Sequence, residues 1–347
     1  MELKKIFLLS GAAMMMLPVV SCKKDKDDTI LSNSFTGTLR FSVPAYVLPG
    51  DVVEAEPRGM NKDTVDIGYY WTVSPILTDK DTTRALGDPA SKTGKFSFEV
   101  PDTLGVLTVN CVAFATGYYT TSASYNCVVV NPEFGKTLTE DGVEPTDPYI
   151  VDGRDGKTYY YKKIGSRDWF VRNLSYTGAG ISYLEAPALD DIYGKYYTWN
   201  EAVIACPEGW RLPVAADWLD LGKAAGYTGE DGNADFLGVA GNLMVNGRFN
   251  GDRMWEYWPA VKITNSTGFS SLPTGYITGD SSGHSSYGNN EYAVYWSGDT
   301  VKLDAEDDEQ ALYKMIYVEK PDMMTGPSHK TGFYATVRCV RDAEPSI

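Results

Sequence analysis

The chain has 347 residues, of which 43% are hydrophobic and 22% are charged, and this is enough apolar material for two packed domains. A net charge of -15 opposes binding to nucleic acid, and two histidines, His284 and His329, are too few for a multi-histidine metal site. The 24 tyrosines and 34 glycines favour a mainly β protein with many turns.

The N-terminus has the pattern of a bacterial lipoprotein signal peptide. Lys4 and Lys5 precede an apolar run over residues 6–20, which has the length of a signal-peptide core and is too short for a comfortable membrane span. The run ends in Leu17-Pro18-Val19-Val20-Ser21-Cys22, which resembles a lipobox, so we expect cleavage after residue 21 and a lipid on Cys22. The alternative is a soluble secreted chain that is cleaved nearby.

The residues after the lipobox indicate where the protein is exported. Residues 23–28 resemble the acid-rich signal that sends Bacteroidetes lipoproteins to the cell surface, and residues 22–34 are expected to form a tether. We therefore predict a protein anchored by lipid in the outer membrane and facing the exterior.

Residues 35–132 predict a first domain made of short strands. Strand-like runs at residues 39–43, 66–73, 94–100, 105–115 and 123–130 are separated by turns rich in Pro, Gly and Asp. Together with Trp71, which is placed to fill a core, this pattern resembles the PKD and immunoglobulin-like β-sandwiches of surface proteins. Such a domain is expected to act as a spacer, with a ligand site of its own as the alternative.

Two cysteines lie in this domain. If the hairpin turns at Tyr119, Cys111 and Cys127 stand opposite each other, close enough for a disulfide. Two separate buried thiols are the alternative.

A linker over residues 133–148 leads into a second domain, residues 149–347, with α+β character. Residues 158–164 and 169–174 predict a β-hairpin, and Thr198 with Glu201 forms a capping box that begins a short helix ending near Cys206. A second helix is expected from Pro213 to Gly226.

Residues 226–292 are irregular and rich in Gly, Asn and Ser, which is typical of functional segments. Residues 333–339 predict a closing strand whose alternation turns Cys339 into the core. Cys206 is its natural partner in an oxidising compartment, so we favour a Cys206–Cys339 disulfide over two free thiols.

The second domain carries a series of short motifs in order, namely Gly156-Lys157-Thr158-Tyr159, Tyr197-Thr198-Trp199, Cys206-Pro207-Glu208-Gly209-Trp210-Arg211-Leu212-Pro213, Asn265-Ser266-Thr267-Gly268-Phe269-Ser270, Tyr295-Trp296-Ser297 and Val337-Arg338-Cys339-Val340. This series resembles the Fibrobacter succinogenes major paralogous (FISUMP) domain. The resemblance implies a C-type-lectin-like α+β fold with a disulfide from the first helix to the last strand. Val214 and Asp217 depart from the family pattern, so weaker capping of the second helix is expected.

The resemblance also limits the chemistry. The loop motifs of calcium-dependent lectins are absent, so no metal and no cofactor are predicted. The chain is similar to formylglycine-generating oxidases in one segment, but its C-terminal part offers only Cys339 and lacks their reactive cysteine pair. We expect no enzyme, although 46 carboxylates leave a glycosidase possible in principle.

The predicted function is binding of a glycan, either a polysaccharide or a host glycan. Sugars stack on aromatic rings and need nearby hydrogen-bonding groups. The aromatic residues in or beside the irregular segment are the candidate ligand-binding residues: Trp255, Trp258, Tyr276, Tyr287 and Tyr292. Core packing is the alternative for each, and an adhesin or fimbria-associated protein that binds a protein partner is the alternative function.

Overall fold

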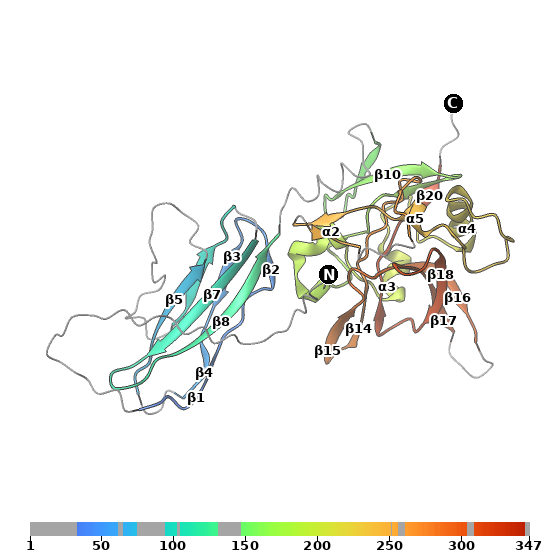
Figure 1. Ribbon diagram of the computed structural model, residues 1–347. Coiled ribbons are helices and arrows are strands. Elements are labelled where there is room, and N and C mark those ends of the chain that lie inside the picture. Colours follow the sequence, from blue (N-terminus) through green and yellow to red (C-terminus); the bar gives the residue numbers. More distant parts are fainter. Residues whose placement is uncertain are drawn as a thin grey trace, which may run out of the picture. The chain divides into compact units, whose positions relative to one another are not determined.

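The computed structural model describes residues 33–61, 65–74, 94–102, 105–130, 147–250, 252–255, 261–303 and 309–343. The chain divides into two compact units between Val129 and Val130, and Figure 1 colours them blue to blue-green and green to red. The predicted signal peptide, Cys22, most of the tether and most of the linker lie outside the described residues. Within the described ranges, no helix is long and apolar enough to cross a membrane.

The first unit is made of strands. Its largest sheet has the order β2-β8-β7-β5, with β2 parallel to β8, and two further pairs are β1-β4 and β3-β6. Trp71 on β5 is buried and stacks on Phe96, with 5.2 Å between ring centroids. The strands are β1 (Gly37–Arg40), β2 (Tyr46–Val47), β3 (Val52–Ala55), β4 (Arg58–Met60), β5 (Gly68–Ser74), β6 (Phe96–Glu99), β7 (Gly105–Phe114) and β8 (Thr121–Val129).

The predicted disulfide between Cys111 and Cys127 is wrong. Strands β7 and β8 pair about a turn centred on Gly117, two residues before Tyr119, so that Cys111 faces Ala123 and Cys127 faces Leu107. A shift of two residues in the turn centre moves each partner by four positions along the strand. Both thiols are free and buried, and burial raises their pKa values to about 12 for Cys111 and about 11 for Cys127.

The described residues of the second unit form four small antiparallel sheets. Their strand orders are β20-β11-β10-β9, β12-β13, β15-β14-β19 and β16-β17-β18. The strands are β9 (Tyr149–Val151), β10 (Thr158–Ile164), β11 (Arg167–Phe170), β12 (Arg248–Phe249), β13 (Asp252–Arg253), β14 (Tyr276–Asp280), β15 (Gly283–Tyr287), β16 (Tyr292–Val301), β17 (Gln310–Tyr317), β18 (Met323–Ser328), β19 (Phe333–Tyr334) and β20 (Val340–Asp342).

Of the predicted closing strand, residues 333–339, only Phe333–Tyr334 forms a strand, β19, and the next strand, β20, begins at Val340, just beyond its end. The residues between them make single bridges to other segments, Ala335 to Tyr197 and Thr336 to Tyr295. The chain therefore stays extended but changes its partner, and Cys339 remains fully buried as its alternation predicts.

Short helices complete the second unit. They are η1 (Tyr183–Glu185), η2 (Pro187–Leu189), α2 (Asp190–Tyr193), α3 (Trp199–Ala205), α4 (Ala215–Ala224) and α5 (Ala240–Leu243). Helix α3 begins at the predicted capping box, in which the Thr198 N–H donates to Glu201 at 2.8 Å and the Glu201 N–H donates to the Thr198 hydroxyl at 3.3 Å.

Helix α4 is capped by acidic groups instead of a hydroxyl. The Val214 N–H donates to Asp217 at 2.9 Å, and the Ala215 N–H donates at 2.7 Å to Asp299, which lies 84 residues away on β16. These two carboxylates satisfy amides that an N-cap side chain would otherwise serve, so the predicted weakening of the cap is offset.

Asp217 is fully buried and holds the start of α4 against β11. Its carboxylate pairs with Arg167 at 2.7 Å and with Arg211. Burial alone raises the pKa of Asp217, but hydrogen bonds from Arg211, the Val214 amide and Arg167 together outweigh it and lower that pKa below its usual value.

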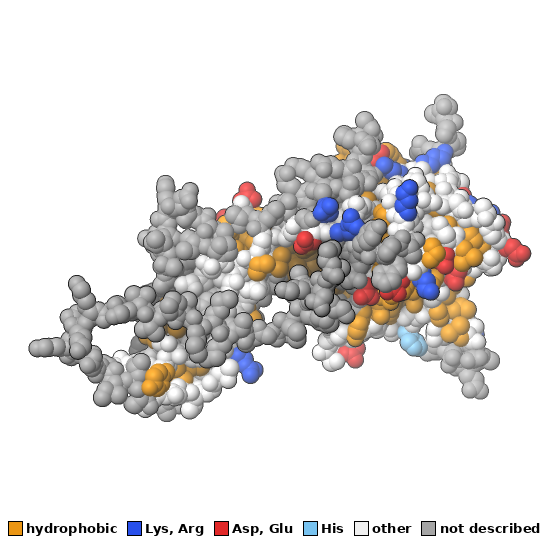
Figure 2. All heavy atoms as spheres, viewed as in Figure 1, with side chains coloured by type: hydrophobic (Ala, Val, Ile, Leu, Met, Phe, Trp, Pro, Cys, Tyr) orange, Lys and Arg blue, Asp and Glu red, His pale blue; other side chains and the backbone are white. Residues whose placement is uncertain are grey.

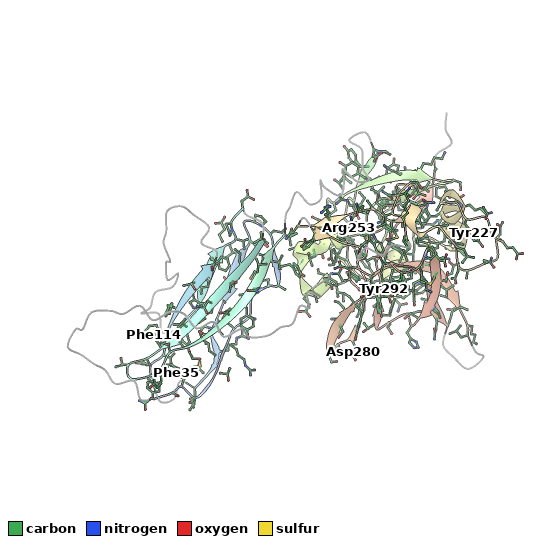
Figure 3. All side chains as sticks on the ribbon, viewed as in Figure 1. Phe35, Phe114, Tyr227, Arg253, Asp280 and Tyr292 are labelled. Atoms are coloured by element: carbon green, nitrogen blue, oxygen red, sulfur yellow. A yellow bond between two sulfur atoms is a disulfide. The ribbon has the colours of Figure 1, made fainter. Side chains whose placement is uncertain are left out.

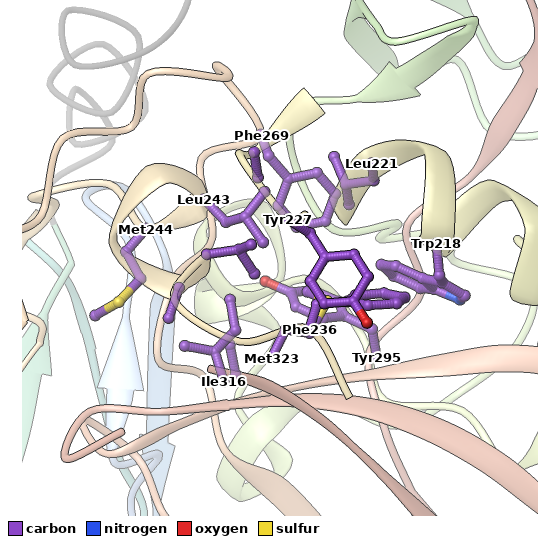
Figure 4. Packing of buried hydrophobic residues seen from close by; sticks show 14 of the residues in the cluster. Trp218, Leu221, Tyr227, Phe236, Leu243, Met244, Phe269, Tyr295, Ile316 and Met323 are labelled. Atoms are coloured by element: carbon purple, nitrogen blue, oxygen red, sulfur yellow. The ribbon is translucent and has the colours of Figure 1, made fainter. Parts of the chain in front are cut away.

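Two linked cores hold the second unit together. Figure 4 shows Trp218 and Leu221 of α4 packed with Phe236, Leu243 and other residues from the irregular segment and from β16 to β18. The second core contains the Cys206–Cys339 disulfide, with 5.8 Å between its Cα atoms, and this confirms the predicted pair. The bond joins the end of α3 to the segment before β20.

Candidate functional site

The hairpin β14–β15 carries the candidate site. Its strands are joined by a turn in which Asp280 accepts a hydrogen bond from the Ser282 N–H at 2.8 Å, an Asx-type arrangement. This bond and one from the Ser282 hydroxyl lower the pKa of Asp280, so the tip of the hairpin is anionic. Figure 3 labels Asp280 at the free end of the hairpin and Tyr292 nearer the body of the unit.

One face of the hairpin begins a row of stacked rings, the aromatic ladder, formed by Tyr287, Tyr276, Phe333 and Tyr313. Successive ring centroids lie 5.6, 5.2 and 5.2 Å apart, with angles of 24°, 26° and 21° between ring planes. Tyr287 and Tyr276 are direct cross-strand partners, while Phe333 and Tyr313 come from β19 and β17. The ladder thus joins two sheets, and Figure 2 shows hydrophobic side chains gathered at the surface near β16 to β18.

The near-parallel stacking decides what the ladder can bind. Tyr276 and Phe333 use both ring faces on their neighbours, and the Tyr313 ring lies so close to Gly326 that a Cβ there would come within 2.4 Å of it. Only Tyr287, at the end of the ladder and 48% exposed, keeps a free face. The inner members therefore present ring edges, and Tyr287 is the ladder residue on which a sugar ring can stack.

Polar side chains continue along the same face of the hairpin. Alternation places Thr278 and Asp280 on the face of Tyr276, and Ser285, the cross-strand partner of Thr278, on the face of Tyr287. From Tyr276 to Asp280 the row spans roughly 13 Å at the usual rise of a strand. An exposed ring is thus followed by two hydroxyls and a carboxylate.

Tyr292 lies beside the ladder and does not belong to it. Its ring meets Tyr276 edge to face at 6.4 Å and stacks on Tyr317 at 4.6 Å. A hydrogen bond to Glu319 raises the pKa of Tyr317, so this hydroxyl is engaged. The two half-buried rings support the ladder from the side.

Trp255 is a core residue, contrary to the prediction that it binds ligand. It is 1% exposed, and its Nε1 donates to the Ser271 carbonyl at 3.1 Å. The packing of the irregular segment against α5 and β16, which its sequence does not reveal, buries this ring. Trp258 lies outside the described residues.

Arg338 holds in place the segment that leads to the hairpin. Its guanidinium is 1% exposed and donates to the carbonyls of Phe269, Ser270 and Phe170 and to the Asn173 side chain. Burial lowers its pKa to about 10, and no acidic group among its partners compensates the charge. Two of the short motifs singled out in the sequence, Gly268-Phe269-Ser270 and Val337-Arg338-Cys339, therefore meet at one buried arginine.

Sequence reasoning missed several residues of this surface. Thr278, Ser285 and Asp280 were recoverable, because two alternating runs flank the turn-forming Asp280-Ser281-Ser282-Gly283. Phe333 and Tyr313 join the ladder only through tertiary packing, and their local sequence carries no such signal.

Within the described ranges, no group of three or more His, Cys, Asp or Glu side chains is arranged to hold a metal ion. In sequence, the family described as Fibrobacter succinogenes major domain matches residues 163–341, just over half of the chain. No curated protein matches the chain. The matched residues include the hairpin, the aromatic ladder, both helices α3 and α4, and the disulfide.

Proposed function

This chain belongs to the Fibrobacter succinogenes major domain family, and we propose that it is a surface lipoprotein that binds neutral glycans through the face of hairpin β14–β15 that carries the aromatic ladder. The role we propose is binding, without catalysis. In this proposal Tyr287 supplies the stacking surface, and Ser285, Thr278 and Asp280 supply hydrogen bonds to hydroxyl groups.

One observation carries the proposal: a single free aromatic face stands next to polar side chains on the same face of a hairpin. A sugar presents C–H groups on one side of its ring and hydroxyls around its edge. Tyr287 suits the first, and the hydroxyls of Ser285 and Thr278 can both donate and accept, as sugar hydroxyls do. The stacked ring of Tyr276 behind Tyr287 keeps the platform rigid, so little entropy is lost on binding.

The test is a screen of the purified protein against polysaccharides and mucin glycans, with the wild type compared with Tyr287→Ala. Loss of one stacking contact is worth about 1.4 kcal/mol, so the affinity should fall about tenfold. Tyr149→Ala is the matched control, because Tyr149 is 59% exposed on β9 of another sheet and should leave binding unchanged.

Two results would contradict the proposal. Absence of binding to every glycan, in protein with its disulfide intact, would argue against glycan recognition as a whole. Equal losses in Tyr287→Ala and Tyr149→Ala would place the binding elsewhere.

We also propose that the protein is anchored by a lipid on Cys22 and faces the cell exterior. The lipobox and the acidic residues that follow it support this. Metabolic labelling with a fatty acid should mark the wild type and not Cys22→Ser, and protease added to intact cells should cleave the protein. A labelled Cys22→Ser variant would refute the anchor.

The finer fold assignment belongs to the same proposal. We assign a C-type-lectin-like fold to the second unit because a disulfide ties α3 to the segment before β20, a second helix follows, and small sheets surround a long irregular segment. The strands of the first unit fit a PKD or immunoglobulin-like spacer. Superposition of experimental structures of each unit on known members of these folds tests both assignments.

A protein partner is the second candidate, favoured by the surface that continues from the Tyr313 end of the ladder. Tyr313, Met315 and Met324 lie half-buried on one face of β17 and β18, and Tyr and Met are enriched in the centres of protein interfaces. Met324→Lys should abolish adhesion to a protein surface and leave glycan binding intact. Unchanged adhesion together with a loss of glycan binding in Met324→Lys would exclude this candidate.

A further inference from the structure

The opposite face of the same hairpin borders a cleft. Ile277, His284 and Ser286 form one wall, and residues 180–182, 184 and 185, together with Lys195, form the other. Its volume is about 460 Å³, within the range of small-molecule sites. Strand alternation separates this cleft from the aromatic ladder, because Ile277 and Ser286 are a cross-strand pair that points away from Tyr276 and Tyr287.

The rim of the cleft is strained. Leu184 and Glu185 are consecutive non-glycine residues with φ of 51° and 57°, a left-handed conformation that costs about 1–2 kcal/mol for each residue. Leu184 is 48% exposed, so burial of its side chain does not compensate the cost. Backbone strain that is not compensated by local packing is typical of binding sites.

Buried rings hold this rim in place. Tyr183 lies just before Leu184 and packs on Tyr193 and Tyr196, with ring centroids 5.1 and 6.1 Å away. The Glu185 N–H donates to the Ser182 carbonyl at 3.1 Å, which closes the turn. Leu184 and Glu185 are therefore set at the cleft by a rigid base.

The polar groups at the cleft carry both signs of charge. Glu185 only accepts hydrogen bonds and Lys195 only donates them, while the hydroxyls of Ser182 and Ser286 do both, and the His284 ring, whose Nε2 lies 3.4 Å from the Tyr334 hydroxyl, can do either. Beneath Ser182 lies Asp190, which is 8% exposed and has one carboxylate oxygen, Oδ1, without a partner among the described residues. Burial raises the pKa of Asp190, despite a hydrogen bond from Ser182 and the nearby Lys195.

This set of groups selects against a charged ligand. An anion would meet the Glu185 carboxylate, and a cation would meet the Lys195 ammonium, each at a cost in a partly enclosed site. A hydroxyl group suits both side chains, because a hydroxyl can donate to a carboxylate and accept from an ammonium. The side chain of Ile181, which is half-buried at the cleft, suits the C–H face of a ring, whereas Ile277 is 1% exposed and forms the floor beneath it.

We propose that this cleft binds one neutral pyranose residue of a glycan, with Glu185 and Lys195 sharing its hydroxyls. The inference rests on the glycan-binding function proposed above and adds a second site on the other face of the same hairpin. The ladder side then holds the body of the glycan chain, and the cleft takes a single sugar unit.

The experiment measures binding of neutral methyl hexosides and methyl N-acetylhexosaminides to the full chain by saturation-transfer NMR and titration. Glu185→Gln and Lys195→Met should each weaken binding at least tenfold. Ser286→Phe fills the cleft from an edge strand and should abolish binding, which keeps the test valid if a rim variant is unstable. Lys223→Met is the control, because Lys223 is exposed on α4, paired with Asp231, and should change nothing.

The outcomes separate this inference from the proposed function. Monosaccharide binding that survives all three cleft variants, or stronger binding of glucuronate or glucosamine than of neutral sugars, would overturn the cleft proposal. Polysaccharide binding that depends on Tyr287 with no monosaccharide bound anywhere would overturn the cleft and leave the proposed function standing. Binding of neutral monosaccharides that is lost in Ser286→Phe and retained in Tyr287→Ala would support the cleft proposal.

Discussion

Replacement of Arg338 by lysine tests the central structural argument for the second unit. The guanidinium serves four buried acceptors: the carbonyls of Phe170, Phe269 and Ser270 and the side chain of Asn173. Lysine keeps the positive charge, so the cost of burying a charge is present in both proteins. The comparison therefore reports the lost hydrogen bonds together with the contacts of the guanidinium with the Phe269 and Tyr295 rings, whose centroids lie 4.6 and 5.6 Å away.

The expected loss follows from the number of bonds. An ammonium donates from one point and has three N–H groups, so it can serve about two acceptors in place of the four that the planar fork reaches. Each buried acceptor left without a partner costs about 1–2 kcal/mol, and Arg338→Lys should therefore destabilise the second unit by about 2–4 kcal/mol.

Urea unfolding followed by tryptophan fluorescence measures this change, because seven of the eight tryptophans lie in the second unit. Arg341→Lys is the control. Arg341 is 27% exposed, pairs with Asp168 at 3.0 Å and lies 4.6 Å from the ring centroids of Tyr161 and Trp210. Because this guanidinium is partly solvated and lysine keeps its charge, Arg341→Lys should cost less than about 1 kcal/mol. A change under about 0.5 kcal/mol in Arg338→Lys would refute the role assigned to this arginine.

Three further predictions concern the remaining acids and cysteines. Asp217→Asn should destabilise the protein by about 2 kcal/mol at pH 7. Because the pKa of Asp217 is lowered in the folded state, its stabilisation is present above the unfolded pKa of about 3.9 and is lost as the pH falls through the folded pKa. An equal destabilisation at pH 7 and at pH 2 would contradict the role of this carboxylate. Removal of the Cys206–Cys339 bond, which spans 133 residues, by a double alanine variant should cost about 4–5 kcal/mol in calorimetry, and an unchanged melting temperature would show that the bond is not structural. Cys111 and Cys127 should react with iodoacetamide only after unfolding and without any reductant, as measured by peptide mass. If the reaction required a reductant, the two residues would form a disulfide after all.

The amino-acid pattern was sufficient where the deciding interactions are local. Thr198 and Glu201 are three residues apart, so their capping box could be read directly and begins α3 as predicted. The alternation in β7, β8 and β10 likewise placed these strands to within two residues at either end. The predicted bond between Cys206 and Cys339 is confirmed: alternation assigned Cys339 to a buried position, and Cys206 was placed at the end of the first helix.

Tertiary structure decided the remaining features, because they depend on residues that are distant in sequence. Trp255 and Tyr287 look alike in an irregular segment without periodicity, yet one is 1% exposed and the other is 48% exposed. Asp299 caps α4 from 84 residues away, which no local motif announces. Burial in such a segment depends on which distant surfaces pack over it. The free ring face of Tyr287 is therefore defined only when the sheets β15-β14-β19 and β16-β17-β18 pack together.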